Sequence, residues 1–194
     1  VMLFRVSERL GKRPLIYDQC LCLAAQGYKT CHLTDSTFTY GADDVLVVPT
    51  VVPVDIEIVP EEDKPLLSLT ILLDFQEILS LMDSIRKHDI DSLDTLPPSP
   101  GAYLEPMSDE IIEPCLRLLK TLKSKGEAEI FGRQIIREIY YRLLMGAGGH
   151  ILASAARGES GYARMTKVLR TIHDNFDQPM DVAQLAEAAN MSTR

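Results

Sequence analysis

Tryptophan is absent from this 194-residue sequence, and cysteine is scarce, with four residues. The cysteines are too few and too unevenly spaced for the disulfide framework of a small secreted domain. They form neither a redox Cys-x-x-Cys pair nor the two pairs of a zinc site. We interpret Cys20, Cys22, Cys31 and Cys115 as small apolar core residues in a reducing compartment. The alternative is a thiol that senses oxidants or electrophiles, which requires a lowered pKa.

Long apolar runs are also missing. No segment approaches the roughly 20 residues that cross a bilayer, and Val1–Arg5 lacks the long apolar core of a signal peptide. We therefore expect a cytoplasmic protein without a membrane segment. With 46% hydrophobic and 25% charged residues, the composition is that of a soluble globular protein, and the chain is long enough to bury a sizeable core.

The formal net charge of −8 is unevenly distributed along the chain. Residues 1–160 contain 16 Lys and Arg against 24 Asp and Glu, whereas residues 161–194 contain 4 of each kind. Phosphates repel an acidic surface, so we expect no contact between the first 160 residues and nucleic acid. We expect those residues to form a separate domain with a function other than DNA binding.

Residues 19–74 predict short β-strands separated by turn signals. Val54, Ile56 and Ile58 alternate with Asp55 and Glu57, which is typical of a half-buried strand. Similar short runs predict strands at 19–24, 28–33, 37–40, 45–49 and 66–73. Several short strands at this spacing indicate an all-β barrel or sandwich.

Beyond Asp74 the apolar period becomes helical. Asp74 and Glu77 form a capping-box pattern, and Pro114 should kink the next helix or shift its start. The two long helices expected at Ser108–Lys123 and Glu127–Met145 could form a homodimer seam or cover the barrel and their own core. One broad apolar stripe can do both, so these alternatives are compatible.

The last 33 residues have the layout of a helix-turn-helix. Tyr162–Phe176 carries an apolar stripe at helical spacing, and Asp181 can cap a second, short helix. Asn190 can end that helix in the left-handed conformation, and Ser192 can cap a third. An ordinary helical hairpin is the alternative interpretation of this pattern.

This stretch resembles the AraC family of bacterial transcription regulators, in Ile172–Val182 (IHDNFDQPMDV) and Leu185–Ser192 (LAEAANMS). Two segments of the β region are similar to the cupin-like sensor barrel of one subtype of that family. They are Tyr17–Lys29 (YDQCLCLAAQGYK) and Pro65–Asp74 (PLLSLTILLD). The resemblance covers nearly the whole chain, and its helix-turn-helix motifs are the more specific.

The resemblance implies an α+β fold, in which a cupin-like β-barrel or jelly roll precedes a helical subdomain and an incomplete helix-turn-helix. We expect the sensor barrel with its closing helix at 1–88, a loop at 89–107, a helical dimerisation and linker subdomain at 108–159, and the start of the DNA-binding domain at 160–194. The protein would be a DNA-binding transcription regulator, and this chain would be mainly its effector-sensing and dimerisation part.

The family's DNA-binding domain contains two helix-turn-helix units, and this chain enters only the first. Ser192, Thr193 and Arg194 would open its recognition helix, where side chains meet base edges or phosphates. We therefore expect the chain itself to bind DNA weakly or not at all.

A small-molecule effector would occupy the barrel. Tyr28, Cys31, His32, Phe38 and Tyr40 combine apolar bulk with polar tips on neighbouring predicted strands, and they are the candidate pocket residues. A barrel packed solid with side chains is the alternative. Strand parity stays open, because a shift by one residue would replace Cys31 by His32 as the inward residue.

Catalysis is not expected from this sequence. The Gly-x-Ser-x-Gly, Walker A and dinucleotide motifs are absent. Metal-dependent cupins need a His-x-His on one strand, and the four histidines here are far apart in the sequence. We therefore expect no catalytic residues, no metal and no cofactor. The alternatives are a cupin-fold enzyme and a stand-alone co-regulator that dimerises without binding DNA.

Overall fold

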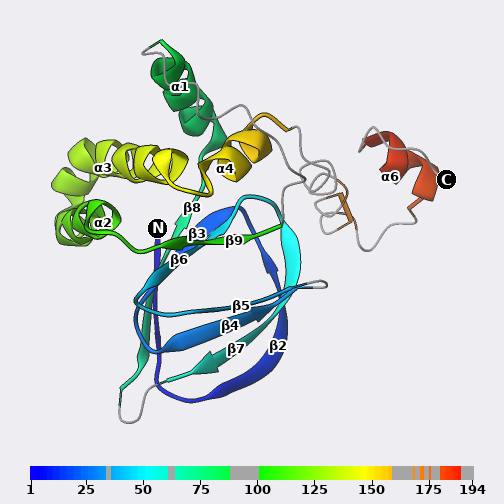
Figure 1. Cartoon of the computed structure of the whole chain (residues 1–194). Coiled ribbons are helices and arrows are strands. Elements are labelled where there is room, and N and C mark those ends of the chain that lie inside the picture. The colour runs from blue at the N-terminus through cyan, green and yellow to red at the C-terminus, as the bar shows by residue number, and fades with distance from the viewer. Residues whose placement is uncertain are drawn as a thin grey trace.

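Two antiparallel β-sheets and a layer of helices make up the computed structural model, which describes residues 1–33, 36–60, 64–87, 101–158, 168, 171, 172, 175 and 180–188. The first sheet has the strand order β1-β8-β3-β6-β9, and the second has the order β2-β7-β4-β5. In Figure 1 the helices lie above the first sheet, which we call the helix-side sheet, and the outer sheet lies below it. The described part of the chain therefore has three layers.

The bounds of the elements are as follows. The strands are β1 (Met2–Val6), β2 (Leu10–Tyr17), β3 (Cys20–Gln26), β4 (Tyr28–His32), β5 (Thr37–Tyr40), β6 (Asp44–Val48), β7 (Val52–Val59), β8 (Leu66–Leu72) and β9 (Tyr103–Pro106). The helices are α1 (Phe75–Arg86), α2 (Asp109–Thr121), α3 (Lys125–Met145), α4 (Gly149–Ala156) and α6 (Val182–Ala188).

The helix-side sheet is buried on both faces, and its central strand β3 shows why. Leu21 and Leu23 point to the core under the helices, whereas Cys20, Cys22 and Ala24 point to the core between the sheets. All five side chains are buried, so β3 is a continuous apolar run without polar alternation. The outer sheet has one buried face, and β7 alternates as predicted, with Val54, Ile56 and Ile58 buried. The predicted α+β, cupin-like fold class is confirmed.

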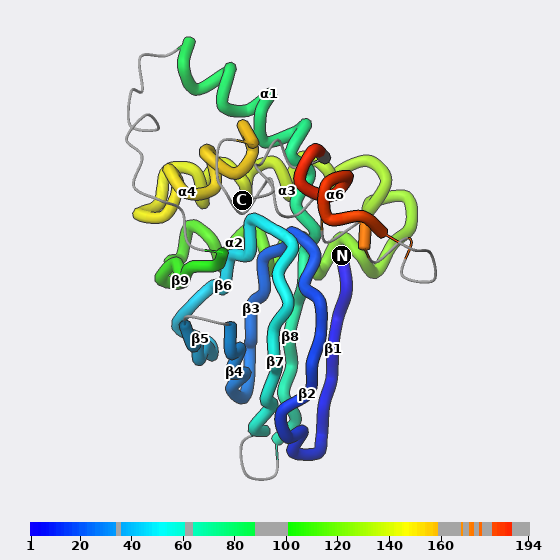
Figure 2. The backbone as a smooth tube through the Cα atoms, turned by 90° about the vertical axis from the view of Figure 1, so that its right-hand side faces the viewer, coloured from blue at the N-terminus to red at the C-terminus, as the bar shows by residue number. Residues whose placement is uncertain are grey.

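Two strands lie where the sequence pattern predicts none. β1 pairs with β8, and β2 pairs with β7, each as the edge strand of its sheet. Figure 2 shows β1 running from the N-terminus beside β8. The sequence of β2 contains Pro14 beside two basic residues and has no apolar alternation. An edge strand tolerates proline because one side of it needs no ladder hydrogen bond.

A third unpredicted strand lies inside the connection expected at 89–107. β9 pairs with β6, and its residues Tyr103 and Glu105 are buried. This part of the predicted loop is therefore wrong. The four-residue strand has too short a pattern to be recognised beside the proline-rich segment that precedes it, and its pairing with β6 decides its conformation.

The helices begin close to the predicted residues. The Asp74 side chain caps α1 by accepting hydrogen bonds from the N–H groups of Gln76 (3.0 Å) and Glu77 (3.1 Å). Glu77 does not complete the predicted capping box, because its carboxylate binds Arg133 and Arg137 of α3 instead. Pro114 lies inside α2, which continues through it to Thr121.

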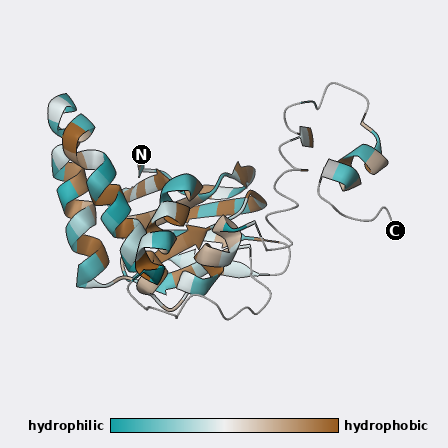
Figure 3. Cartoon of the chain, turned by 90° about the horizontal axis from the view of Figure 1, so that it is seen from above, coloured by the Kyte–Doolittle hydropathy of each residue, from teal (hydrophilic) through white to brown (hydrophobic). Residues whose placement is uncertain are grey.

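Helix α3 is the centre of the helical layer and packs against α1, α2 and α4. The helices carry apolar as well as polar residues along their length (Figure 3). In α6, Asp181 Oδ1 accepts a hydrogen bond of 3.0 Å from the N–H of Ala183, as expected of the predicted cap. Most of the other residues of the predicted helix-turn-helix lie outside the described residues.

Candidate functional site

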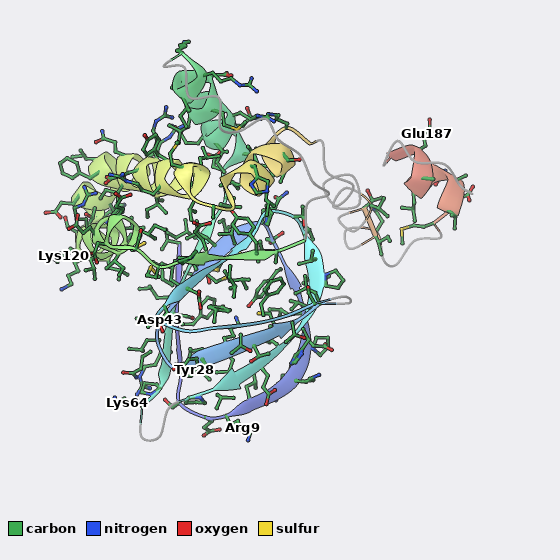
Figure 4. All side chains as sticks on the ribbon, in the orientation of Figure 1. Arg9, Tyr28, Asp43, Lys64, Lys120 and Glu187 are labelled. Carbon is green, nitrogen blue, oxygen red and sulfur yellow. The ribbon has the colours of Figure 1, made fainter. Side chains whose placement is uncertain are left out.

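The structure brings together three of the five candidate pocket residues. Cys31 and Phe38 are direct cross-strand partners in β4 and β5, and both face the core between the sheets together with Tyr40. His32 points the other way, with Nδ1 3.3 Å from Thr37 Oγ1, and Tyr28 is 53% exposed (Figure 4). The strand parity left open by the sequence is therefore decided, and Cys31 is the inward residue.

Polar and sulfur-bearing side chains gather in the core between the sheets. We call this group the interior thiol cluster, and it consists of Tyr17, Cys20, Cys22, Cys31, Tyr40 and Thr70. Cys20 Sγ lies 3.7 Å from Cys22 Sγ, and Cys22 Sγ lies 3.5 Å from Thr70 Oγ1. All four cysteines of the chain are buried and reduced.

A separate apolar groove opens between the helix-side sheet and α2. Its volume is about 530 Å³, and Arg5 is the only charged residue among those that line it. The lining residues are Leu3, Phe4, Arg5, Leu23, Ala24, Ala25, Ala42, Leu67, Ser68, Leu69, Met107, Ile112, Cys115, Leu116 and Leu119. The groove has the size of a small-molecule site.

The groove exists because α2 has two apolar faces. Ile111, Cys115 and Leu118 are buried in the core, while Leu116, 50% exposed, and Ile112 line the groove. When the apolar stripe of a helix is wide, one part of it can pack in the core while another part stays exposed to solvent. The opposite wall comes from β1 and β8, so the sequence pattern, which predicts no β1, could not reveal this site.

Ion pairs hold three of the helices together. Glu77 at the start of α1 accepts hydrogen bonds from Arg137 and Arg133, which lower the pKa of its carboxyl group below 4.5. Arg117 of α2 pairs with Glu138 of α3 at 2.5 Å, and Arg142 pairs with Glu110 at 3.2 Å. These pairs connect α1, α2 and α3 into one unit.

The end of the α2–α3 hairpin exposes large apolar side chains. Leu122 is 39% exposed, Ile130 63% and Phe131 48%. Leu122 directly follows α2, and Ile130 and Phe131 lie in the first two turns of α3. In Figure 4, Lys120 marks the end of α2. We call this surface the hairpin tip.

The predicted DNA-contacting residues Ser192, Thr193 and Arg194 lie outside the described residues. Within the described ranges, no three His, Cys, Asp or Glu residues come close enough together to hold a metal ion. None of the described helices has the length and apolar character needed to cross a membrane.

The family described as "AraC-type transcriptional regulator N-terminus" matches residues 1–151. The chain belongs to this family. Residues 1–151 are thus the N-terminal domain of an AraC-type transcription regulator. This family consists of transcription regulators, which are not enzymes. No curated protein matches the sequence.

Solved structures of ToxT from Vibrio cholerae resemble this AraC-type domain in fold. An apo ToxT variant has a TM-score of 0.63 at 9% identity, and the match covers 98% of this chain and 70% of that one. ToxT bound to (E)-4-(8-methylnaphthalen-1-yl)but-3-enoic acid has a TM-score of 0.58 at 9% identity with the same coverage. ToxT bound to an unsaturated fatty acid has a TM-score of 0.53 at 7% identity, covering 98% of this chain and 68% of that one.

Proposed function

We propose that this chain is the control part of a cytoplasmic, DNA-binding transcription regulator, and that it binds a small-molecule effector and forms a homodimer. Membership of the AraC-type family supports the regulatory role. The excess of acidic residues in the first 160 residues supports a division of labour, in which the domain begun at 160–194 contacts DNA. This role requires no catalysis and no cofactor.

The groove between the helix-side sheet and α2 carries the proposal of an effector site. Its volume of about 530 Å³ falls within the range of small-molecule pockets, and its lining is almost entirely apolar. Arg5, with its guanidinium hydrogen-bonded to Ser7 at 2.9 Å, supplies one positive charge at the groove. This combination suits an apolar molecule that carries one carboxylate.

The ligands of the ToxT structures have the same chemistry. One is an unsaturated fatty acid and the other a naphthalenyl butenoic acid, and each joins an apolar body to one carboxylate. We infer the same class of effector here. The core around Cys31, Phe38 and Tyr40 is the second candidate, but side chains pack that region, whereas the groove is open.

The position of the groove offers a route from effector binding to dimerisation. One wall is the sheet and the other is α2, which packs along α3 through the Arg117–Glu138 pair. A ligand that fills the groove would set the spacing between α2 and the sheet. The hairpin tip, where α2 meets α3, would then move with α2.

The hairpin tip is the proposed surface for a second copy of this chain. Leu122, Ile130 and Phe131 expose apolar area that a partner could bury. Dimers also suit the repeated half-sites on DNA that helix-turn-helix regulators bind. The long helices at 109–121 and 125–145 would then be the dimerisation subdomain predicted from the sequence.

Binding of a fluorescent unsaturated fatty acid, compared with the matching alcohol, tests the effector site. The chain should bind the acid, and Arg5→Gln should weaken acid binding about tenfold without affecting the alcohol. Ala42→Phe, which places a ring in the groove, should weaken both ligands. Arg13→Gln on β2, outside the groove, is the matched control. Equal acid binding by all variants would contradict the proposed site.

Sedimentation tests the dimer separately. Phe131→Ser should shift the chain toward monomer, whereas Ile16→Ser, at an equally exposed apolar residue of β2, should leave the dimer intact. An electrophoretic shift assay with this chain should show weak or no DNA binding. A monomeric wild-type chain would overturn the dimer proposal, and tight sequence-specific DNA binding would overturn the division of labour.

A further inference from the structure

The two cores of this protein differ in chemistry. The core under the helices is aliphatic apart from two tyrosines, Tyr103 and Tyr140, and one thiol, Cys115. The core between the sheets holds three thiols in the interior thiol cluster, where Cys22 contacts both Cys20 and Thr70. Packing alone does not require the Cys20 thiol and the Thr70 hydroxyl to contact the Cys22 sulfur atom.

Tyr40 is a second, independent observation at the same place. Its side chain is 1% exposed, and its hydroxyl has no hydrogen-bond partner among the described residues. Burial raises the pKa of Tyr40, and Cys22, Tyr17 and Cys31, which belong to the same core, raise it further. Leaving a buried hydroxyl without a hydrogen-bond partner costs free energy, so such a group calls for an explanation.

The surroundings of Cys22 favour its thiolate. The hydrogen bond from Cys20 lowers the pKa of Cys22, and Thr70 and Lys29 act in the same direction, against the effect of burial. The same Cys20–Cys22 contact raises the pKa of Cys20. By contrast, burial raises the pKa of Cys115 to about 11. Thiolates react with peroxides and thiols do not, so the cysteines of this chain should differ in reactivity.

The cluster lies in the packed core between the sheets, and only β8 separates β3 from the edge strand β1. Across the helix-side sheet, Cys22 pairs with Thr70 of β8, and Thr70 pairs with Met2 of the edge strand β1. Met2 is 40% exposed, and Leu72, the cross-strand partner of Cys20, is 48% exposed. Hydrogen peroxide would have to reach Cys22, which is 2% exposed, past these edge residues.

We propose that the Cys20–Cys22 pair is a peroxide-reactive dithiol, with Cys22 as the residue that is oxidised first and Cys20 as the resolving thiol. This inference does not depend on the effector site or on the hairpin tip. The oxidant is hydrogen peroxide or a small organic hydroperoxide, ROOH.

The reaction proceeds in two balanced steps. The Cys22 sulfur attacks one peroxide oxygen, the O–O bond breaks, and ROH leaves with the thiol proton, so Cys22 becomes a sulfenic acid. The Cys20 sulfur then attacks the Cys22 sulfur, the S–O bond breaks, and water leaves with the proton of Cys20. In total, two thiols are oxidised to one disulfide by two electrons, and ROOH is reduced to ROH and water.

The disulfide would change the centre of the fold. Cys20 and Cys22 are two residues apart on one strand, so joining them must distort the pleat of β3. Leu72 pairs with Cys20, and its backbone oxygen accepts a hydrogen bond of 2.8 Å from Tyr140 of α3. Oxidation at Cys20 would therefore act on the contact between the sheet and the helices.

Peptide mass spectrometry after peroxide treatment tests the proposal. The folded chain is treated with hydrogen peroxide, its free thiols are alkylated after unfolding, and the products are mapped. The wild type should form a Cys20–Cys22 disulfide while Cys115 stays reduced. In Cys20→Ser the reaction should stop at a Cys22 sulfenic acid, which a 1,3-diketone reagent traps.

Three further variants make the test decisive. Cys22→Ser should leave Cys20 reduced, and Cys115→Ser, the matched control, should form the disulfide at the wild-type rate. Thr70→Val keeps both thiols and removes the hydroxyl beside Cys22, so it should slow oxidation several-fold. This variant keeps the proposal testable if Cys22→Ser fails to fold. Oxidation of Cys115 or Cys31 as fast as Cys22, or an unchanged rate in Thr70→Val, would overturn the proposal.

Discussion

Tyr140 of α3 donates a hydrogen bond of 2.8 Å to the backbone oxygen of Leu72, the last residue of β8. The same hydroxyl accepts a hydrogen bond of 3.1 Å from the N–H of Asp74, which caps α1. One side chain thus joins the helix-side sheet, the start of α1 and the longest helix. Tyr140 itself is 1% exposed, and both bonds are partly buried.

Tyr140→Phe should destabilise the chain by about 1 kcal/mol, because two partly buried backbone groups lose their partner. Urea unfolding followed by circular dichroism measures the free energy of unfolding. Tyr28→Phe, at an exposed hydroxyl, is the control and should leave the stability unchanged. Equal stability of wild type and Tyr140→Phe would show that water replaces the lost hydrogen bonds.

Glu77→Gln should weaken the attachment of α1 to α3 in a pH-dependent way. Because Arg137 and Arg133 lower the pKa of Glu77 below 4.5, its contribution is fully present above that value and is lost as the pH falls through the folded-state pKa. The variant should be less stable than wild type by about 1 kcal/mol at pH 7, and the difference should shrink in acid.

Unfolding curves of Glu77→Gln between pH 7 and 3, at low and high salt, check this prediction. Glu129→Gln removes the exposed Lys125–Glu129 pair, whose atoms are 4.0 Å apart, and should have almost no effect. A stability difference for Glu77→Gln that stays constant down to pH 3 would contradict the assigned ion pairs.

Gly27 and Gly132 should respond to alanine in opposite directions. Gly27 joins β3 and β4 with φ of 77°, and an added Cβ would lie 3.2 Å from Leu66 Cα, so Gly27→Ala should cost about 1–2 kcal/mol. At Gly132 in α3 a Cβ meets nothing within 4 Å, so Gly132→Ala should stabilise by about 0.5–1 kcal/mol. Melting temperatures of both variants test the pair, and shifts of the same sign would refute it.

Leu118→Ala and Leu116→Ala should distinguish the two faces of α2. Leu118 is 0% exposed in the core under the helices, so its truncation should cost about 2–5 kcal/mol. Leu116 lines the groove and is 50% exposed, so its truncation should cost little but should weaken binding of an apolar acid. Chemical unfolding and ligand titration of both variants separate stability from binding.

Strong local patterns predict most of this fold. The alternation at Val54, Ile56 and Ile58 and the cap at Asp74 depend on neighbouring residues alone, and both are present in the structure. β1, β2 and β9 escape prediction because their conformation comes from pairing with β8, β7 and β6, which are distant in sequence. The Glu77 carboxylate likewise binds an arginine distant in sequence instead of completing the capping box of its own helix.

The candidate site was predictable only in part. Phe38 and Tyr40 share one face because residues two apart on a strand point the same way, which follows from local geometry. Cys31 joins them because it is the cross-strand partner of Phe38, which only the pairing of β4 with β5 decides. The choice between Cys31 and His32 as the inward residue depends on which face of the outer sheet is buried. The groove depends on β1, so no local signal in the sequence indicates it.

By itself, the sequence determined the family, the succession of strands β3 to β8 and of the helices that follow, and the separation of an acidic control region from a neutral C-terminal segment. These properties depend on residue identity and short-range periodicity. Only the tertiary structure decided where α2 leaves an open groove and which thiols meet between the sheets. Both results follow from packing of elements far apart in the chain, where strand pairing and burial, rather than local propensity, select the arrangement.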